Sequence, residues 1–167
     1  LAFGNNGDYA LDQRRDNGNS IYYTSAPQET TTMLGNATVA LRLTVGQPQA
    51  LVAVRLCDIA PDGAATLVTW GLLNLTHRDS HLDPAPAPVN TPFDVTVSLN
   101  MAGHRLAAGH RWAVAISPTY WPHAWPSPVS VTLTVQQCAL HLPVRVGEDG
   151  DPAPFGAPEI APPIALE

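Results

Sequence analysis

Apolar and polar residues alternate along much of the chain, and this pattern predicts an all-β fold. The runs 39–45, 93–99 and 129–135 place Val, Leu or Phe at every second position, mostly with Thr, Ser, Asp or Arg between them. A period of two that is rich in Val and Thr is typical of half-buried strands. The runs 51–59 and 112–117 are apolar on both faces, so we predict that they are central strands.

Turn sequences separate the predicted strands. The sequence Pro-Asp-Gly at 61–63 predicts a tight hairpin between the run 51–59 and the next strand, 66–75. A first strand is expected at residues 20–25. Residues 26–34 are expected to form one short turn at most, and no stretch shows a convincing helical pattern.

The eight or nine short strands predict a two-sheet β-sandwich of jelly-roll type, in which aligned sheets bury their apolar faces against each other. The predicted domain spans residues 20–146. Residues 1–19 are polar and are expected to be an approach segment. The proline-rich residues 147–167 are expected to form an extended tail, whose anchors are Phe155 and Ile160 and whose last residues could derive from a vector.

Charge and composition narrow the classes of partner. The 167 residues carry 14 acidic and 8 basic side chains, with a net charge of −6 and no lysine. An acidic chain without a basic stripe argues against nucleic acids and anionic membranes as partners. The lack of lysine indicates a GC-rich, bacterial genome. No apolar window reaches 18 residues and no leader opens the chain, so we expect no membrane span and no signal peptide and favour a cytoplasmic location.

The motifs of common catalytic sites are missing, so we expect no catalytic residue and no cofactor. None of the seven serines lies in a G-x-S-x-G elbow, and no Gly-rich phosphate loop occurs. The triplet at 77–79, His-Arg-Asp, matches the kinase catalytic loop, but the chain lacks the lysine and the Gly-rich loop that a kinase needs. Residue chemistry alone therefore favours a binding or scaffolding domain.

Metal sites and a disulfide are weaker alternatives to structural roles. His77 and His81 are four residues apart, but prolines follow and no helix is expected to place them on one face. Asp58 and Asp62 flank the predicted hairpin. We expect Asp58 to end its strand and Asp62 to make a side-chain turn bond, with calcium binding as the alternative. The two cysteines, at positions 57 and 138, are expected to be buried thiols, and a single disulfide is the other possibility.

The segment 117–128 is unusual because it contains two of the four tryptophans and four prolines. Prolines exclude a helix and keep the segment out of a sheet ladder. The segment is either a platform for a ligand or a loop that packs against another surface. We expect Trp121 to be mainly buried within its own domain and Trp125 to contribute to a contact surface.

Two ordered motifs resemble a known family. Residues 55–81 contain Arg-Leu-Cys-Asp, then Pro-Asp-Gly, then a strand of the form Gly-x-Leu-Asn-Leu-x-x-Arg. Residues 108–128 contain Gly-His-Arg, Ile-Ser, Trp-Pro and a closing proline. Together they resemble the C-terminal domain of X-Pro dipeptidyl-peptidases and of related cocaine-esterase-like (CocE/NonD) serine hydrolases, over roughly residues 20–145.

The resemblance implies a jelly roll of the galactose-binding-like kind. It also implies that the catalytic serine, aspartate and histidine lie in an α/β-hydrolase domain upstream, so this chain alone would not be an enzyme. The parent would cleave X-Pro peptides or acyl esters, and the resemblance leaves the choice between them open.

The expected role of the chain is to dock on the upstream hydrolase domain and to shape the rim of its active site. Carbohydrate binding and a standalone, oligomerising interaction module are the alternatives. The candidate residues for the contact are Arg78, Arg111, Tyr120, Trp121 and Trp125.

Overall fold

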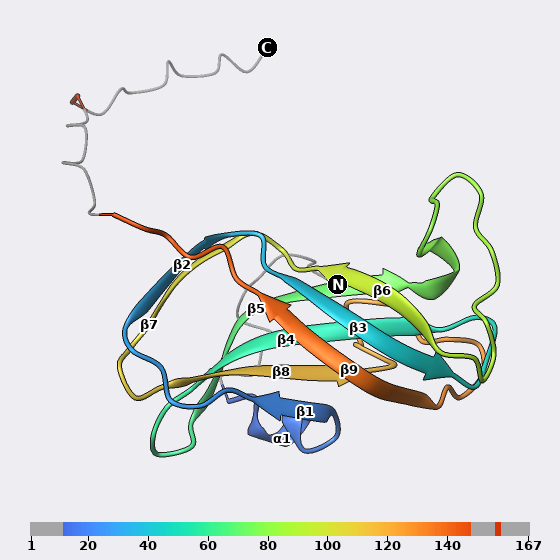
Figure 1. Ribbon diagram of the computed structural model, residues 1–167, viewed down its shortest axis with the longest axis horizontal. Helices are drawn as coiled ribbons and strands as arrows, with labels where there is room; N and C mark the ends of the chain where they lie inside the picture. The colour runs from blue at the N-terminus through green and yellow to red at the C-terminus, as the bar shows by residue number, and fades with distance from the viewer. Residues whose placement is uncertain (1–11, 148–155, 158–167) are drawn as a thin grey trace, which may run out of the picture.

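Two layers of antiparallel strands face each other across an apolar core (Figure 1). The structure, a computed structural model, describes residues 12–147 and 156–157. The fold of these residues confirms the prediction of an all-β sandwich. The elements are α1 (Arg14–Asn17), β1 (Ile21–Thr24), β2 (Thr31–Gly35), β3 (Thr38–Val45), β4 (Leu51–Ile59), β5 (Ala65–Asn74), the 3-10 helix η2 (Leu75–His77), β6 (Phe93–Ser98), β7 (Ala102–Leu106), β8 (Arg111–Ser117) and β9 (Leu133–His141).

The first layer is a four-stranded sheet in the order β1–β8–β4–β5, with every pair antiparallel. Its two middle strands, β4 and β8, are the two runs whose sequence is apolar on both faces. Each is flanked by a strand on both sides, so the prediction that they are central strands is confirmed. The hairpin between β4 and β5 is also as predicted: Gly63 has a φ of +87°, and the Asp62 carboxylate accepts a hydrogen bond of 2.9 Å from the Ala64 N–H.

The second layer is built around a three-stranded sheet in the order β6–β3–β9, and it crosses in front of the first layer in Figure 1. Beyond the ends of β3 and β6 the same two chain segments pair again as β2 and β7. Gly35, with a φ of +130°, lies where β2 ends and the chain turns into β3. Past β9 the chain runs beside β2, since the Arg145 N–H donates to the Thr32 carbonyl.

The core lies between the two layers and follows from the alternation in the sequence. Along β3, buried residues alternate with half-buried ones from Thr38 to Val45, so only one face of this strand meets the core. The apolar side chains at the centre are contributed by both sheets: Val39, Leu41, Leu43, Val52, Val54, Leu56, Val114 and Ile116.

Three segments differ from the predictions made for them. Residues 31–35 form strand β2, not a turn, because β7 lies beside them as a partner from far along the chain. Strand β7 was not predicted at all. Strand β9 begins at Leu133 and not at residue 129, because its neighbour β3 ends opposite Leu133, at Val45, and offers no partner to the residues before it.

The structure also bears on the predictions made for the cysteines, for membrane-spanning helices and for the C-terminal tail. The two cysteines are unpaired, with Cys57 buried and Cys138 half-buried. Among the described residues, no helix has the length and apolar character needed to cross a membrane. The predicted tail anchors, Phe155 and Ile160, lie outside the described residues.

Candidate docking surface over a buried arginine

The outer face of the four-stranded sheet is buried although it points away from the core. Ala53, Arg55 and Cys57 of β4, and Ala113 and Ala115 of β8, are all almost inaccessible to solvent. Four of these five side chains are small, which lets other segments approach the sheet closely. Among the described residues, the segments that contact Arg55 on this face are the region of α1 and the loop 118–128.

Arg55 lies at the centre of this covered face and is only 2% exposed. Its Nη1 donates to Gln13 Oε1 at 2.7 Å, and its Nη2 donates to Ser20 Oγ at 2.9 Å. Both acceptors are uncharged. The carboxylate of Asp16 stands 4.0 Å away and is itself 57% exposed, while the Tyr120 ring centroid lies 6.0 Å from the guanidinium. The positive charge is therefore buried without a close counter-ion among the described residues.

The loop 118–128 is fixed onto the sheet by an aromatic cluster. The ring centroid of Trp70, on β5, lies 5.5 Å from that of Tyr120 and 5.0 Å from that of His123. Tyr120 and His123 are 4.6 Å apart, and the Ala124 N–H donates to the Tyr120 carbonyl at 2.9 Å. Desolvation lowers the pKa of His123 below its usual value, as expected for an imidazole packed between aromatic rings.

The two tryptophans of the loop point outward. Trp121 is 62% exposed and Trp125 is 83% exposed, with their ring centroids 5.4 Å apart in an edge-to-face arrangement. The expectation that Trp121 is mainly buried is wrong, since Tyr120 and His123 are the side chains of the loop that pack on Trp70 of the sheet. Trp125 is exposed as expected. We call Trp121, Trp125, Pro126 and Pro128, which line one shallow hollow, the Trp surface.

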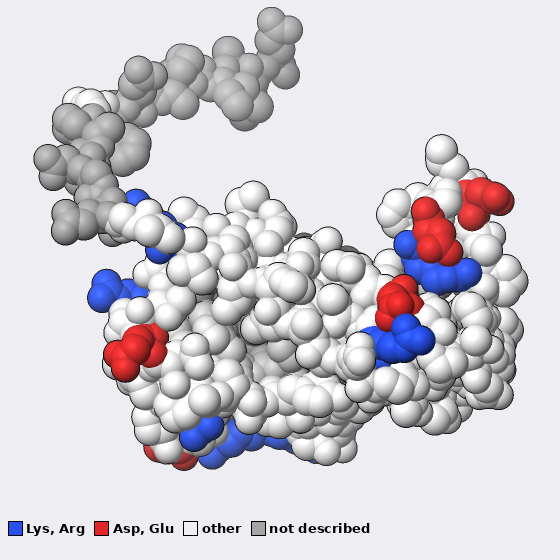
Figure 2. Space-filling view, viewed as in Figure 1, with Lys and Arg blue, Asp and Glu red and all other residues white. Residues whose placement is uncertain are grey.

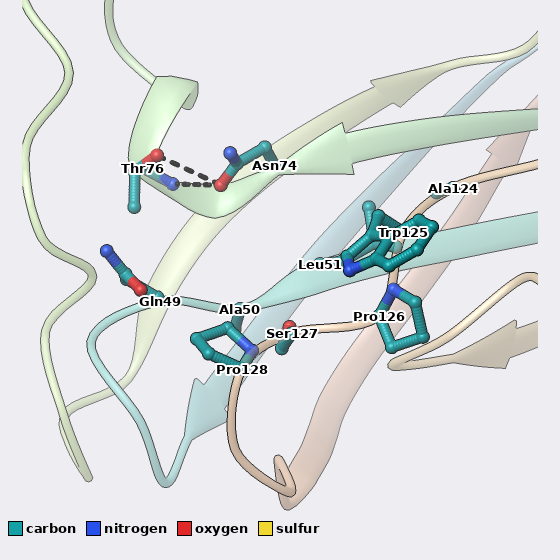
Figure 3. A pocket seen from close by; sticks show the side chains of 10 residues that line it. All are labelled: Gln49, Ala50, Leu51, Asn74, Thr76, Ala124, Trp125, Pro126, Ser127 and Pro128. Carbon is teal, nitrogen blue, oxygen red and sulfur yellow. Dashed lines mark hydrogen bonds between the residues drawn. The ribbon is translucent and has the colours of Figure 1, made fainter.

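A groove beside Trp125 has a volume of about 360 Å³ (Figure 3). Its far side carries the amide of Gln49 and the side chains of Asn74 and Thr76. The Asn74 carbonyl oxygen accepts from the Thr76 N–H at 3.1 Å and from the Thr76 hydroxyl at 2.9 Å, as the dashed lines show. The fold thus brings two amide side chains to the neighbourhood of Trp125 that lie far from it in sequence.

Of the five candidate contact residues, Tyr120, Trp121 and Trp125 lie together, whereas the two arginines have other surroundings. Arg78 Nη1 donates to three backbone carbonyls of its own loop, at Leu75, Ala85 and Pro86, over 3.0 to 3.2 Å. Its guanidinium also stacks over a phenylalanine ring at 5.7 Å and pairs with the neighbouring aspartate at 3.1 Å. These contacts give Arg78 a local role in holding the loop after η2.

Arg111 begins β8 and is exposed. Its Nη1 donates to the Ser25 carbonyl at 3.0 Å, and the Trp112 N–H donates to the Ser25 hydroxyl at 3.0 Å. These bonds tie the chain that follows β1 to the start of β8. The contacts found for Arg111 therefore involve the edge of the four-stranded sheet and not the loop 118–128.

Asp58 fastens the two layers to each other, which the sequence did not suggest. Its carboxylate contacts His104 Nε2 at 2.8 Å and His110 Nδ1 at 2.7 Å, and its side chain is 12% exposed. Asp58 is in β4, His104 is in β7 and His110 precedes β8, so one carboxylate joins both layers. Asp62 is engaged in its turn, and the described residues include no group of three or more His, Cys, Asp or Glu suited to hold a metal ion.

These contacts explain the structural roles of two sequence motifs, Arg-Leu-Cys-Asp at 55–58 and Gly-His-Arg at 109–111. The Arg-Leu-Cys-Asp motif places Arg55 on the covered outer face and Asp58 at the join between the layers. The Gly-His-Arg motif supplies His110 to that join. Sequence reasoning missed Arg55 and the two histidines, although a charged residue inside the apolar run 51–59 was a signal that could have singled out Arg55.

Fold and site together define a β-sandwich domain with an aromatic surface loop held over a buried arginine. The sequence model of one family, described as the X-Pro dipeptidyl-peptidase C-terminal non-catalytic domain, matches residues 3–148. The chain therefore belongs to this family. No curated protein matches the sequence significantly.

Solved structures share the fold at low sequence identity. An α-amino acid ester hydrolase matches with a TM-score of 0.68 and 23% identity over 80% of this chain. An aminopeptidase from a marine sediment Thaumarchaeota archaeon matches with a TM-score of 0.69 and 15% identity over 78% of this chain. A CocE/NonD family hydrolase from Staphylococcus aureus gives 0.63 and 12% over 75%. The match covers only 27%, 27% and 30% of these three chains, respectively.

Proposed function

We propose that this chain is an accessory domain that docks on the α/β-hydrolase domain of a serine peptidase or acyl esterase through the Trp surface. The observation that carries the proposal is the exposure of Trp121 and Trp125, at 62% and 83%, on a loop whose other aromatic residues are packed down. Membership of a non-catalytic domain family supports a partner that carries the chemistry.

The physical argument rests on area and on rigidity. A tryptophan that buries about 200 Å² on docking contributes up to about 5 kcal/mol at 25 cal/mol per Å². Tryptophans are also enriched among the few residues that dominate binding energies at interfaces. The packing of Tyr120 and His123 on Trp70 holds the loop in place before docking, so little conformational entropy remains to be lost.

The activity we propose for the whole protein is hydrolysis through an acyl-enzyme, with the serine, aspartate and histidine supplied by the hydrolase domain. The names of the similar structures, an ester hydrolase, an aminopeptidase and a CocE/NonD hydrolase, support this class of reaction. X-Pro peptides and acyl esters are both substrates of this chemistry. We expect the chain alone to turn over neither Gly-Pro arylamides nor aryl esters, and turnover by the purified chain would contradict the accessory role.

The test is a calorimetric titration of the chain with a separately produced hydrolase domain. We expect the double variant Trp121→Ala/Trp125→Ala to weaken binding by about thirtyfold or more, the effect of losing about 2 kcal/mol at a binding hot spot. Leu82→Ala is the matched control, because Leu82 is an exposed apolar residue outside the Trp surface. Equal effects of the two changes, or no binding of the wild-type chain at micromolar concentrations, would overturn the docking proposal.

Carbohydrate binding is the second candidate, and the groove beside Trp125 favours it. Amide groups next to an exposed indole can bind sugar hydroxyls while the indole stacks on the ring, and Gln49 and Asn74 line this groove with Trp125. This function is tested by titrating the chain with methyl glycosides and measuring the tryptophan fluorescence at each step. A response that is lost in Trp125→Ala and kept in Trp121→Ala would support it, and a fluorescence signal that never responds would end it.

A further inference from the structure

The buried charge of Arg55 is only partly accommodated by the residues around it. A guanidinium carries five N–H groups, and Gln13 and Ser20 accept two of them. Among the described residues, the other three have no acceptor within hydrogen-bond distance. The nearest carboxylate, of Asp16, is 4.0 Å away, which is too far for a charge-assisted hydrogen bond.

Arg55 also lines a pocket that opens beside it. The pocket has a volume of about 270 Å³, and besides Arg55 its walls include Ser20, Thr119, Tyr120 and Trp121. Asp16 stands at the same pocket. A buried cation, the hydroxyl groups of Ser20, Thr119 and Tyr120, and two aromatic rings therefore surround a space large enough for the end of an acidic side chain.

A carboxylate fits this pocket better than other anions do. It is planar and can accept two parallel N–H bonds from a guanidinium. Its single negative charge would neutralise Arg55, whereas a phosphate would add a second charge beside the carboxylate of Asp16.

We propose that the Arg55 pocket is a carboxylate-binding site, which receives an Asp or Glu side chain of the docked hydrolase domain. The inference rests on the proposed function, because Trp121 belongs both to the Trp surface and to the pocket wall. The acidic side chain of the partner enters between Tyr120 and Trp121 while the indoles are being covered. Docking then supplies a carboxylate at hydrogen-bond distance, which Arg55 lacks among the described residues.

Free carboxylates should bind the same pocket weakly, because they lack the effective concentration that docking provides and because Asp16 repels them. The first experiment titrates the isolated chain with acetate at constant ionic strength and follows the Arg55 Nε–H and the Trp121 indole N–H by nuclear magnetic resonance. Acetamide, which has the same shape without the charge, is the matched control. We expect saturable shifts of both signals with acetate and none with acetamide.

Shifts that are equal for acetate, acetamide and chloride would overturn the inference without any need for a variant. Arg55→Lys provides a second measurement, because it keeps the charge and removes the two parallel donors. In this variant we expect the response of the Trp121 indole to acetate to weaken by about tenfold or more. An unchanged response would show that the Arg55 guanidinium does not donate to the carboxylate.

The second experiment separates this inference from the proposed function. In the complex with the hydrolase domain, we expect the Arg55 Nε–H to shift as it does with acetate, and Arg55→Lys to weaken docking by about tenfold or more. Arg42→Lys is the control, since Arg42 lies on the opposite sheet. A complex that forms equally well with Arg55→Lys overturns the inference and leaves the proposed function standing. Acetate binding without any complex overturns the assignment to a docked partner and the proposed function together.

Discussion

The outer faces of the two sheets differ in how far they are covered by other parts of the chain. The face of β6–β3–β9, which Figure 2 views, is solvated, with few charged side chains and those at its margins. Its Arg42 forms an exposed ion pair with Asp94 at 2.9 Å. The outer face of β1–β8–β4–β5 instead has Arg55 almost completely buried beneath a loop.

The difference between the faces is already present in the strands. Buried and half-buried residues alternate along β3, whereas every residue from Leu51 to Cys57 of β4 is buried. A strand that is apolar on both faces needs a cover on both faces. In this domain the core is one cover, and the other is made by segments with little regular structure. The loop that serves as a cover also carries the exposed Trp surface.

The largest effect is expected from removing the buried charge. Arg55→Met removes two hydrogen bonds that a charged group donates, to Gln13 Oε1 and Ser20 Oγ, which should lower the free energy of unfolding by about 3 kcal/mol. Arg42→Met removes only an exposed ion pair and should cost less than about 1 kcal/mol. Urea unfolding of the two variants measures the comparison, and equal costs would mean that the covered face adds nothing to stability.

A smaller effect is expected at the join between the layers. Asp58→Asn removes the charge that accepts hydrogen bonds from two histidines and should lower the free energy of unfolding by about 2 kcal/mol. Asp62→Asn is the matched control at the nearby hairpin, where an asparagine oxygen can still accept the bond from Ala64. If the control cost as much as Asp58→Asn, the two imidazole contacts would not be what holds the layers together.

Local pattern was enough to predict the strands that alternate strictly or are apolar on both faces. These strands, β3, β4, β6 and β8, owe their structure to burial that their own sequences specify. Strands β2 and β7 could not be predicted in this way, because each forms by pairing with the other about 70 residues away. The start of β9 was misplaced for the same reason, since the end of β3 decides it.

The candidate site was predicted only in part. Trp125 was expected at a contact surface and is exposed. Which aromatic residues of the loop face the sheet depends on Trp70, which lies in a distant strand. The surroundings of Arg55 come from α1, β1, β4 and the loop 118–128, so no stretch of sequence contains the pocket. Asp58 meets two histidines 46 and 52 residues away.

Cysteine labelling tests how tightly the covered face is closed. Burial raises the pKa of the Cys57 thiol to about 11, so only about one thiol in a thousand is ionised at pH 8. Burial also raises the pKa of Cys138, which lies in β9 and is only half-buried. We expect a thiol reagent at pH 8 to modify Cys138 well before Cys57, with Cys138→Ser and Cys57→Ser assigning the two phases. Equally fast modification would show that the cover opens readily.

The smallest effect concerns the pH dependence of the cover. Desolvation lowers the pKa of His123, so the folded protein favours the neutral imidazole and the unfolded chain binds the proton more readily. The stabilisation is complete above the unfolded pKa of about 6.5 and decreases as the pH falls below it. We expect the difference in free energy of unfolding between wild type and His123→Gln to be smaller at pH 5 than at pH 7.5. A difference that does not change with pH would place His123 outside the aromatic cluster.

The central claim, that the covered face meets the hydrolase domain while the solvated face does not, is tested most directly by hydroxyl-radical footprinting. The chain is oxidised alone and when joined to the hydrolase domain, with the exposed Met101, which follows β6, as the reference. We predict that oxidation of Trp121 and Trp125 falls several-fold on joining while that of Met101 stays unchanged. Equal oxidation of both tryptophans in the two states would contradict the account.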